Sequence, residues 1–364
     1  MSKPEVAVIG GGLAGAAAAC GLAAGGRRVL LIERMAGPHD KVCGEFVSGE
    51  AERWLAELGL AGELDRLGAV PIERLRLVAG RIEASAALPF RACGLSRRRL
   101  DAALLDHAAG LGAEVRRGVA ARSLVQDGAG LGLDLGGDRL AVGAALLATG
   151  KHELRGWARA ARPAPLIGLK LHLELAPAMR SKLAGHVELA LFAGGYAGLQ
   201  LVEEGRANLC LVITKERFAG LDRDWRRLVA QVPHLARRLA GAEPCRSQPL
   251  AIFRIPYGHL QRGGDGGGPV YRIGDQLAVI PSFTGDGMAM ALRSAALATQ
   301  ALAAGRPPAA FHAEATAAFT PSMRLAGLVA RLAATVPLQA PLVAACRLLP
   351  ALASGVAAAT RAAA

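Results

Sequence analysis

Apolar residues near the N-terminus fall into two short runs separated by an alanine-rich stretch. Val6 to Ile9 and Val29 to Ile32 are unbroken apolar runs of strand length. The stretch between them begins with Gly10, Gly12 and Gly15 and has the length of a helix. The pattern predicts a strand, a tight turn, a helix and a second strand that ends at Glu33.

The glycines and the acidic residue of this unit are typical of a dinucleotide site. In the motif G-x-G-x-x-G, Gly10 makes the turn, Gly12 lets the backbone approach a pyrophosphate, and Gly15 lets the helix pack closely on the strand. The helix N-terminus then presents free N–H groups to the pyrophosphate. Glu33 lies 18 residues after Gly15, where a carboxylate can accept hydrogen bonds from an adenosine ribose. The alternative is a glycine-rich turn that binds nothing, and this stretch does not choose between FAD and NAD.

The next part of the chain alternates between helical and strand-like spacing. The stretch 48–59 and the amphipathic stretch 97–109 predict helices, the first with Ser48 as its cap. The residues 74–90 predict a hairpin that turns near Gly80. Further strands are predicted at 114–117, in a meander over 120–142, and at 144–148, where a buried strand runs into Thr149 and Gly150.

Strand patterns dominate from Pro165 to Pro256. Strands are expected at 167–175, 186–192, 198–202, 208–213 and 250–255. One helical stretch, 222–240, interrupts them. This region therefore predicts a separate antiparallel sheet. After a connector at 261–268, a strand at 270–273 leads to Gly274 and Asp275, and a helix is predicted at 285–303. The remainder, 307–364, is expected to be helical, with turns at its prolines.

Composition and charge exclude several classes of protein. The formal net charge of +13 across 364 residues comes mainly from arginines, which are scattered and lack interleaved aromatic residues, so nucleic-acid binding is not expected. Biased residue usage explains this charge equally well. The six cysteines contain no C-x-x-C pair, so neither a disulfide framework nor a metal site is expected. No apolar run reaches the roughly 18 to 20 residues of a spanning helix, and no signal pattern is present. A cytoplasmic location follows.

Three further stretches carry chemistry. Arg97, Leu100 and Asp101 form an R-x-x-L-D motif at a predicted helix start. The second stretch is the strand that ends at Gly150, where the absence of a side chain lets the backbone approach a cofactor. The third stretch is RIGDQLAVIPSFTGDGMAMA over 272–291, in which Gly274 and Asp275 end a strand and a P-x-x-x-G-x-G pattern leads into a helix.

In this order the motifs resemble those of FAD-dependent oxidoreductases of the p-hydroxybenzoate hydroxylase fold, and within them the branch of geranylgeranyl reductases and related dehydrogenases. The resemblance covers roughly residues 5 to 305. It implies an α/β fold with a discontinuous Rossmann-like FAD-binding domain (1–73, 91–160 and 262–310), an inserted antiparallel sheet domain for the substrate (74–90 and 161–261) and a helical C-terminal segment (311–364). The cofactor-binding residues that it implies are Gly10, Gly12, Gly15, Glu33, Arg34, Lys41, Arg97, Gly150, Asp275, Pro281, Gly285 and Gly287.

Departures from related signatures narrow the expected chemistry. Flavin hydroxylases of this fold usually carry Asp-Gly where this chain has Thr149 and Gly150. The W-x-W-x-I-P signature of flavin halogenases is absent, which disfavours a halogenase. Geranylgeranyl reductases often carry Y-x-W-x-F-P, of which only Tyr196 is matched here, so a prenyl chain is not established as the substrate.

Candidate catalytic residues come from three places. The stretch Lys41 to Gly44 resembles the lysine-x-cysteine-glycine of the reductase branch, which places Cys43 near the flavin; the alternative is a buried structural thiol. Lys170 and His172 share one face of a predicted strand, where an exposed face is the simpler interpretation, and Tyr257 approaches a strand end. Such groups can orient a phenolate or carbonyl, and His172 can exchange protons near neutral pH.

We therefore expect an FAD-dependent oxidoreductase that acts on a hydrophobic small molecule of prenyl, polyketide or quinone-like type. Reductase or dehydrogenase chemistry is preferred, with NAD(P)H as a transient electron donor or with an external electron donor. An aromatic-ring monooxygenase is the alternative, and a flavin electron carrier without its own substrate is the alternative of another class. The apolar stretch 325–352 suits a lipid-like substrate, docking on an anionic membrane, or helices packed on the FAD domain.

Overall fold

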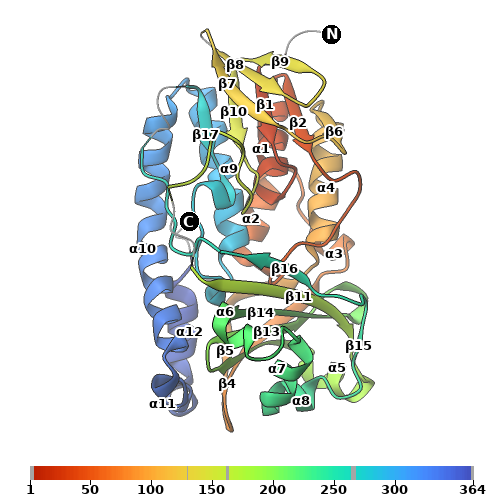
Figure 1. The fold of residues 1–364 in the computed structure, drawn as a ribbon, viewed down its shortest axis with the longest axis vertical. Coiled ribbons are helices and arrows are strands. Elements are labelled where there is room, and N and C mark those ends of the chain that lie inside the picture. The colour runs from red at the N-terminus through yellow and green to blue at the C-terminus, as the bar shows by residue number, and fades with distance from the viewer. Residues whose placement is uncertain (1–3, 129, 161–163, 264–267, 362–364) are drawn as a thin grey trace.

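The computed structural model describes residues 4–128, 130–160, 164–263 and 268–361, and Figure 1 shows how their elements are arranged. One half of the molecule is built on a five-stranded parallel sheet in the order β17-β10-β1-β2-β6. Its strands are β1 (Val6–Ile9), β2 (Val29–Glu33), β6 (Glu114–Arg117), β10 (Ala144–Leu147) and β17 (Val270–Arg272). The sheet thus joins segments from opposite ends of the chain, and the predicted connector before β17 lies partly outside the described residues, at 264–267.

Layers on both faces bury this sheet. On one face lie α1 (Leu13–Ala24), α4 (Arg97–Gly110) and α9 (Gly287–Ala303), whose apolar residues form one core with those of β1 and β10. On the other face lies the predicted meander, with the strands β7 (Ser123–Asp127), β8 (Gly130–Asp134) and β9 (Arg139–Val142). Burial on both faces explains why β1, β2 and β10 are apolar runs without alternation.

The other half of the molecule is built on a nine-stranded sheet. Eight strands follow the order β15-β11-β14-β13-β12-β4-β5-β3, and β16 pairs with β11 beside them. Their bounds are β3 (Phe46–Ser48), β4 (Val70–Ala79), β5 (Ile82–Gly94), β11 (Leu166–Glu174), β12 (Gly185–Phe192), β13 (Gly195–Leu201), β14 (Ala207–Thr214), β15 (Glu243–Pro244) and β16 (Leu250–Phe253).

The prediction of an antiparallel sheet was wrong at one seam, because β4 and β12 pair in parallel. The hairpin of β4 and β5 enters the sheet from a segment that lies far from β12 in the sequence. No tight turn joins β4 to β12, so nothing forces an antiparallel pairing at this seam.

Short helices cover the outer face of the large sheet. They are α5 (Pro177–Leu183), α6 (Lys215–Ala219), α7 (Trp225–Gln231) and α8 (Pro233–Arg238). The single helix expected over 222–240 is therefore two helices. Val232 has extended backbone angles (φ −107°, ψ 100°) because it precedes Pro233, whose ring disfavours a helical residue before it.

The C-terminal segment forms α10 (Pro308–Ala334), α11 (Val336–Leu348) and α12 (Pro350–Ala359), which lie along the left side of Figure 1. Turns at every proline were expected, but Pro321 lies inside α10 and Pro341 inside α11. The chain does turn at Thr335 and Leu349, just before Pro337 and Pro350, so the expected turns form at these two prolines. No described helix is by itself long and apolar enough to cross a bilayer; α10 and α11 meet the criteria only as a pair that bends by 110°.

The remaining elements are short. They are α2 (Gly49–Glu57), α3 (Glu63–Arg66), η1 (Glu203–Gly205), η2 (Gly274–Gln276) and η3 (Ser282–Thr284). Ser48 precedes α2 as predicted, but its side chain makes no capping hydrogen bond. The hydroxyl of Ser96, at the start of α4, does accept one, from the Arg99 N–H.

A buried carboxylate fastens α8 to the outer face of the large sheet. Glu188 of β12 is paired with Arg76 of β4, and it accepts hydrogen bonds from His234 Nε2 at 2.7 Å and from Arg238 Nη2 at 2.6 Å. Burial alone would raise the pKa of Glu188, but the hydrogen bonds and charges of His234 and Arg238 outweigh burial and lower it to about 2.

Replacing Glu188 with Gln should lower the free energy of unfolding at pH 7 by about 3 kcal/mol, the equivalent of that pKa shift. The folded-state pKa is depressed, so this stabilisation is present above the ordinary carboxyl pKa and is lost as the pH falls from about 4.5 towards 2. Urea unfolding between pH 7 and pH 3 measures it. The control is Glu83→Gln, at an exposed partner of the same Arg76. A Glu188→Gln deficit that did not shrink with falling pH would contradict the assignment.

Candidate active site

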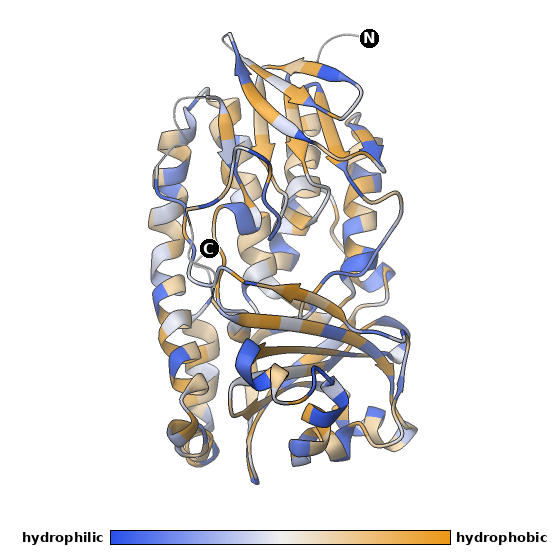
Figure 2. Ribbon diagram, viewed as in Figure 1, coloured by the Kyte–Doolittle hydropathy of each residue, from blue (hydrophilic) through white to orange (hydrophobic). Residues whose placement is uncertain are grey.

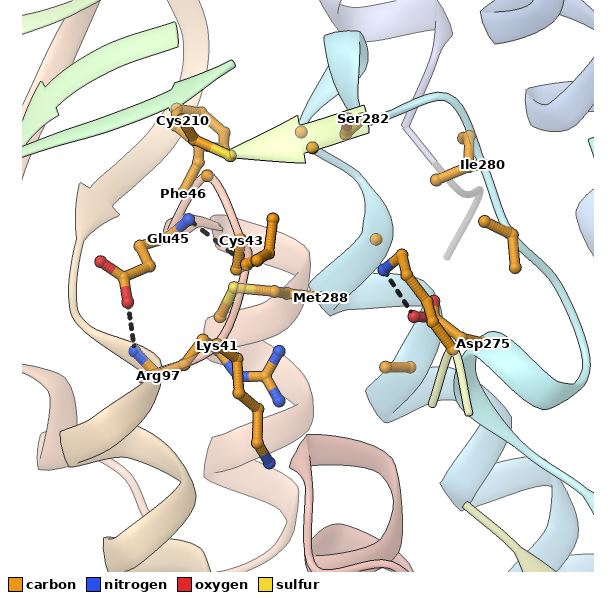
Figure 3. A pocket seen from close by; sticks show the side chains of 18 of the residues that line it. Lys41, Cys43, Glu45, Phe46, Arg97, Cys210, Asp275, Ile280, Ser282 and Met288 are labelled. Carbon is orange, nitrogen blue, oxygen red and sulfur yellow. Dashed lines mark hydrogen bonds and ion pairs between the residues drawn. The ribbon is translucent and has the colours of Figure 1, made fainter. Parts of the chain in front are cut away.

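One cavity of about 980 Å³ runs between the two halves of the molecule. It begins at the glycine-rich turn after β1, passes the loop 39–46 and the inner face of the large sheet, and ends against α10 to α12. Figure 3 shows Cys43 and Glu45 on one side of this cavity and Asp275 on the other. The carboxyl ends of β1, β10 and β17 meet here, as expected of a binding site in a parallel sheet.

The turn after β1 has no room for side chains. Gly10 has φ +111°, and a Cβ there would lie 2.4 Å from the Ala148 carbonyl oxygen. A Cβ at Gly15 would lie 1.9 Å from the Gly10 carbonyl oxygen. Gly10 and Gly12 line the cavity, whereas Gly15 lies behind them, where α1 packs on the strand. Gly10 and Gly15 therefore require glycine for steric reasons.

The N-terminus of α1 and two basic side chains leave a cradle suited to a pyrophosphate. Gly12 precedes the helix without a side-chain cap, and the first turn holds no acidic residue. A Cβ at Gly12 would lie 3.3 Å from Lys41 Nζ and 3.5 Å from Arg97 Nη2, so both cations face the helix start. Free N–H groups beside two cations form an anion site.

Asp101 holds both of these cations in place. It accepts hydrogen bonds from Lys41 Nζ at 2.8 Å and from Arg97 Nε at 2.8 Å. Burial would raise the pKa of Asp101, but Arg97 and Lys41 lower it below its ordinary value, so the carboxylate stays ionised. This explains the R-x-x-L-D motif: Asp101 lies one helical turn after Arg97 and orients its guanidinium.

Glu33 lies at the end of β2 with its carboxylate already oriented. Its two oxygens accept hydrogen bonds from the Gly11 N–H at 2.8 Å and the Met35 N–H at 2.9 Å. Each oxygen keeps a lone pair for a ribose hydroxyl. Arg34 lines the cavity beside it and contacts His152 Nε2 at 2.9 Å. Burial and the Arg34 charge lower the pKa of His152 and favour a neutral ring.

Asp275 is paired with a lysine that the sequence analysis did not single out. Lys151 Nζ donates to Asp275 Oδ2 at 2.7 Å. Burial would raise the pKa of Asp275, but Lys151, followed by Arg159 and Arg97, lowers it. Lys151 follows Gly150, which has φ +64° and lines the cavity. The signal in the sequence was the position of Lys151 directly after Gly150, the glycine at which the predicted strand ends.

The P-x-x-x-G-x-G stretch forms part of the cavity wall. Gly285 has φ +77°, and a Cβ there would lie 2.9 Å from the Phe46 ring. Gly285 and Gly287 line the cavity, as does Ser282, whereas Pro281 is buried just before η3 and does not line it.

The expectation of an exposed strand face at Lys170 and His172 was wrong. Both side chains are buried and face the loop 39–45, although neither lines the cavity. Lys170 Nζ pairs with Glu45 Oε1, and His172 Nε2 contacts Glu45 Oε2 at 2.7 Å. The strand pattern could not show this burial, because the covering segment lies more than 120 residues away in the sequence.

Glu45 is the residue that sequence reasoning missed. It is fully buried, has φ +58°, and its Oε1 also accepts the Arg97 N–H at 2.9 Å. Gln200 of β13 donates to the Glu45 carbonyl oxygen at 2.8 Å, and Asn208 of β14 donates to the Gly44 carbonyl oxygen at 2.8 Å. Gln200 and Asn208 are polar residues within otherwise apolar strands, and this was the signal in the sequence that a polar segment lies against the sheet. Gln200 and Asn208 together hold the Cys43-Gly44-Glu45 segment against the sheet. The positive charge that balances the buried Glu45 carboxylate is the ammonium group of Lys170.

The centre of the cavity carries thiols and hydroxyls. Cys43 and Cys210 both line it, and burial raises the pKa of the Cys210 thiol to about 12. In the same region, the Ser282 hydroxyl contacts the Tyr196 hydroxyl at 2.6 Å and also the Tyr257 hydroxyl. Burial raises the pKa of both tyrosines. We call Tyr196, Tyr257 and Ser282 the hydroxyl cluster.

Beyond the hydroxyl cluster the cavity becomes apolar. The inner face of β4 and β12 supplies one wall and the C-terminal helices supply the other, with Leu75, Leu77, Leu189, Leu191, Leu332, Leu342, Leu352 and Val356 among the lining residues. The C-terminal helices therefore complete a chamber rather than only packing on the nucleotide-binding half.

Replacing Asp275 with Ala should weaken FAD retention at least roughly tenfold, because a hydrogen-bonding carboxylate is lost and Lys151 keeps no partner there. Fluorescence titration of the stripped protein with FAD measures this. Asp106→Ala is the matched control, since Asp106 is an exposed carboxylate that pairs with Arg117 outside the cavity. Unchanged retention in Asp275→Ala would remove Asp275 from the site.

Replacing Glu45 with Gln should lower the free energy of unfolding by roughly 3 kcal/mol, because the buried Lys170 would keep only the more distant Asp40, 3.9 Å from its Nζ, as an ionic partner. Urea unfolding followed by circular dichroism measures this. Glu174→Gln, at an exposed position on the same strand β11, should change stability by less than about 0.5 kcal/mol. Equal effects of the two substitutions would show that the Glu45 pairing does not hold the structure together.

Sequence comparison identifies the N-terminal part of the chain. Residues 3–137 match the model of the FAD binding domain family. No curated protein sequence matches the chain at a significant level.

Solved structures match over nearly the whole chain. The flavin-dependent brominase Bmp2 is 19% identical, with a TM-score of 0.80 over 99% of this chain and 93% of that one. PqsL of P. aeruginosa, as a four-residue mutant, is 19% identical, with a TM-score of 0.76 over 93% and 99%. The myxobacterial chondrochloren halogenase CndH is 19% identical, with a TM-score of 0.73 over 86% and 78%. At this level of identity the likeness establishes the fold. Residues 3–137 therefore form an FAD-binding domain, and the whole chain has the fold of these flavin-dependent enzymes, the p-hydroxybenzoate hydroxylase fold expected from the sequence.

Proposed function

We propose that this protein reduces a carbon–carbon double bond in a hydrophobic small molecule that binds in the apolar chamber. The observation that carries the proposal is the order of surfaces along one cavity. The dinucleotide cradle leads to the hydroxyl cluster, and the hydroxyl cluster leads to the leucine-lined chamber. A largely apolar cavity with a few convergent polar groups is the usual form of a small-molecule site.

The chamber favours an enzyme with its own substrate over an electron carrier. A carrier needs an exposed flavin edge for its partner, whereas this cavity extends past the cofactor cradle to the inner faces of β4, β12 and the C-terminal helices. Its leucines suit an aliphatic or ring-containing apolar molecule, such as a prenyl, polyketide or quinone-like compound.

Bound FAD in its reduced form supplies a hydride to the substrate. The residues of this chain supply the proton and the orientation. Tyr196 and Tyr257, whose pKa values are raised by burial, stay protonated at physiological pH, and their hydroxyls in the cavity can donate a proton. Tyr257 would donate the proton to the second carbon, and Ser282, in contact with both tyrosines, would pass a replacement proton from Tyr196. Tyr196 would then recover its proton from water, so that one solvent proton is consumed in each turnover.

The electrons for each turnover must come from outside the chain. NAD(P)H as a transient donor or an external donor protein would return the flavin to its reduced form. Thr149 stands where flavin hydroxylases of this fold usually carry an aspartate, which supports a transient rather than a stable nicotinamide site.

Anaerobic reduction of the FAD-loaded protein by NADPH and NADH tests the reaction class, with the flavin absorbance followed before and after candidate compounds are added. We expect slow reduction that is indifferent to ligand, followed by reoxidation by an olefin or a quinone. Rapid reduction only in the presence of a phenol, with oxygen incorporated into that phenol in air, would instead establish a monooxygenase.

Replacing Tyr257 with Phe should lower kcat for the olefin about 100-fold, because the general acid is lost, while FAD affinity stays unchanged. Wild-type kcat should show no loss from tyrosine ionisation between pH 7 and pH 9, since both tyrosine pKa values are raised above 10. Tyr271→Phe is the control: its hydroxyl donates to the Arg306 carbonyl oxygen and Tyr271 does not line the cavity. Equal kcat values in the two variants would exclude Tyr257 as the proton donor.

A further inference from the structure

The C-terminal helices expose apolar side chains at the end of the molecule that holds the large sheet. Leu348 and Leu349, at the junction of α11 and α12, are 81% and 65% exposed. We call the exposed set the leucine surface: Leu328, Leu332, Val336, Leu338, Leu348, Leu349 and Leu352. Figure 2 shows these helices at the lower left, with hydrophobic colours extending along them. Exposed leucines concentrated on consecutive helices mark an interaction surface.

The charged residues of the chain segment that carries the leucine surface have a single sign. Arg324, Arg331 and Arg347 are exposed on α10 and α11. Residues 315–364 contain neither Asp nor Glu. This segment therefore combines apolar insertion groups with cations and contributes no acidic group to the surface.

The leucine surface is continuous with the cavity. Leu332 of α10 and Leu352 of α12 both line the cavity and are also exposed. The sharp bend between α10 and α11 places the end of one helix and the start of the next together at this point. A hydrophobic molecule entering between these side chains would pass directly from the leucine surface into the chamber.

We propose that the leucine surface docks on an anionic phospholipid bilayer. The leucines enter the boundary between headgroups and acyl chains, and Arg324, Arg331 and Arg347 bind lipid phosphates. A second copy of the chain fits this surface less well, because a twofold contact would bring the arginines of both copies together without acidic partners. Delivery of the substrate from the bilayer would be a second step, and that step rests on the proposed function. Docking itself does not depend on the proposed function.

Vesicle co-sedimentation of the full-length, FAD-loaded protein tests the proposal. Vesicles of phosphatidylcholine alone are compared with vesicles that also contain phosphatidylglycerol. We expect binding to the anionic vesicles that weakens as salt is added, and at least roughly tenfold weaker binding to the neutral ones. Equal binding to both, or binding to neither, would overturn the proposal.

Variants locate the contact. Leu348→Glu with Leu349→Glu, and separately Arg331→Glu with Arg347→Glu, should each weaken binding to anionic vesicles at least about tenfold. None of these four residues lines the cavity, so flavin content should be unchanged. The matched controls are Val125→Glu, at an apolar residue 43% exposed on β7, and Arg246→Glu with Arg262→Glu, at exposed arginines outside the helices; they should bind like the wild type.

Two further measurements show whether a second copy of the chain occupies the leucine surface and whether docking and the proposed reduction stand or fall separately. A dimer in size-exclusion chromatography that Leu348→Glu with Leu349→Glu dissociates, without vesicle binding by the wild type, would assign the surface to a second copy and overturn the proposal. Turnover of a detergent-dispersed olefin is measured in parallel. Turnover without vesicle binding refutes docking alone, and vesicle binding without turnover refutes the proposed reaction alone.

Discussion

The pairing of Glu45 with Lys170 and His172 joins the two halves of this molecule. Glu45 comes from the loop that follows β2, and its partners come from β11 of the large sheet. A fully buried carboxylate is costly unless it is paired and hydrogen-bonded, and Glu45 receives two side chains and one backbone N–H. Together with Gln200 and Asn208, which bind the backbone of the same segment, this pairing sets the position of Cys43 and Gly44. The Arg97 N–H ties Glu45 to the start of α4.

The inner face of the large sheet is divided along its width. Towards β11 and β14 it carries the polar residues that hold the loop, and towards β4 and β12 it carries leucines that form the chamber. The outer face is apolar opposite α6 to α8, apart from the Glu188 cluster. Because side chains alternate along a strand, the same strands serve a core on one side and a site on the other.

The cofactor cleft and the chamber meet because the chain returns to the first sheet late. β17 pairs with β10 only after the large sheet has been completed, and its end places Asp275 beside Lys151 and Gly150. The helices that follow then run back along the large sheet and close the chamber. A discontinuous nucleotide-binding half therefore holds the sheet domain between its own segments.

Local sequence determined the strand-turn-helix-strand unit, the glycines of its turn and the position of Glu33. These features follow from nearest-neighbour sterics and from periodicity within about thirty residues. The same reasoning located the R-x-x-L-D motif and the Gly274-Asp275 turn, because each lies at the end of a regular element. Only the tertiary structure decided the burial of Lys170 and His172, the partner of Asp275, the parallel seam between β4 and β12, and the role of the C-terminal helices as a cavity wall. A strand pattern reports that a face is polar or apolar, but what covers that face depends on segments far away in the sequence, which only folding brings together.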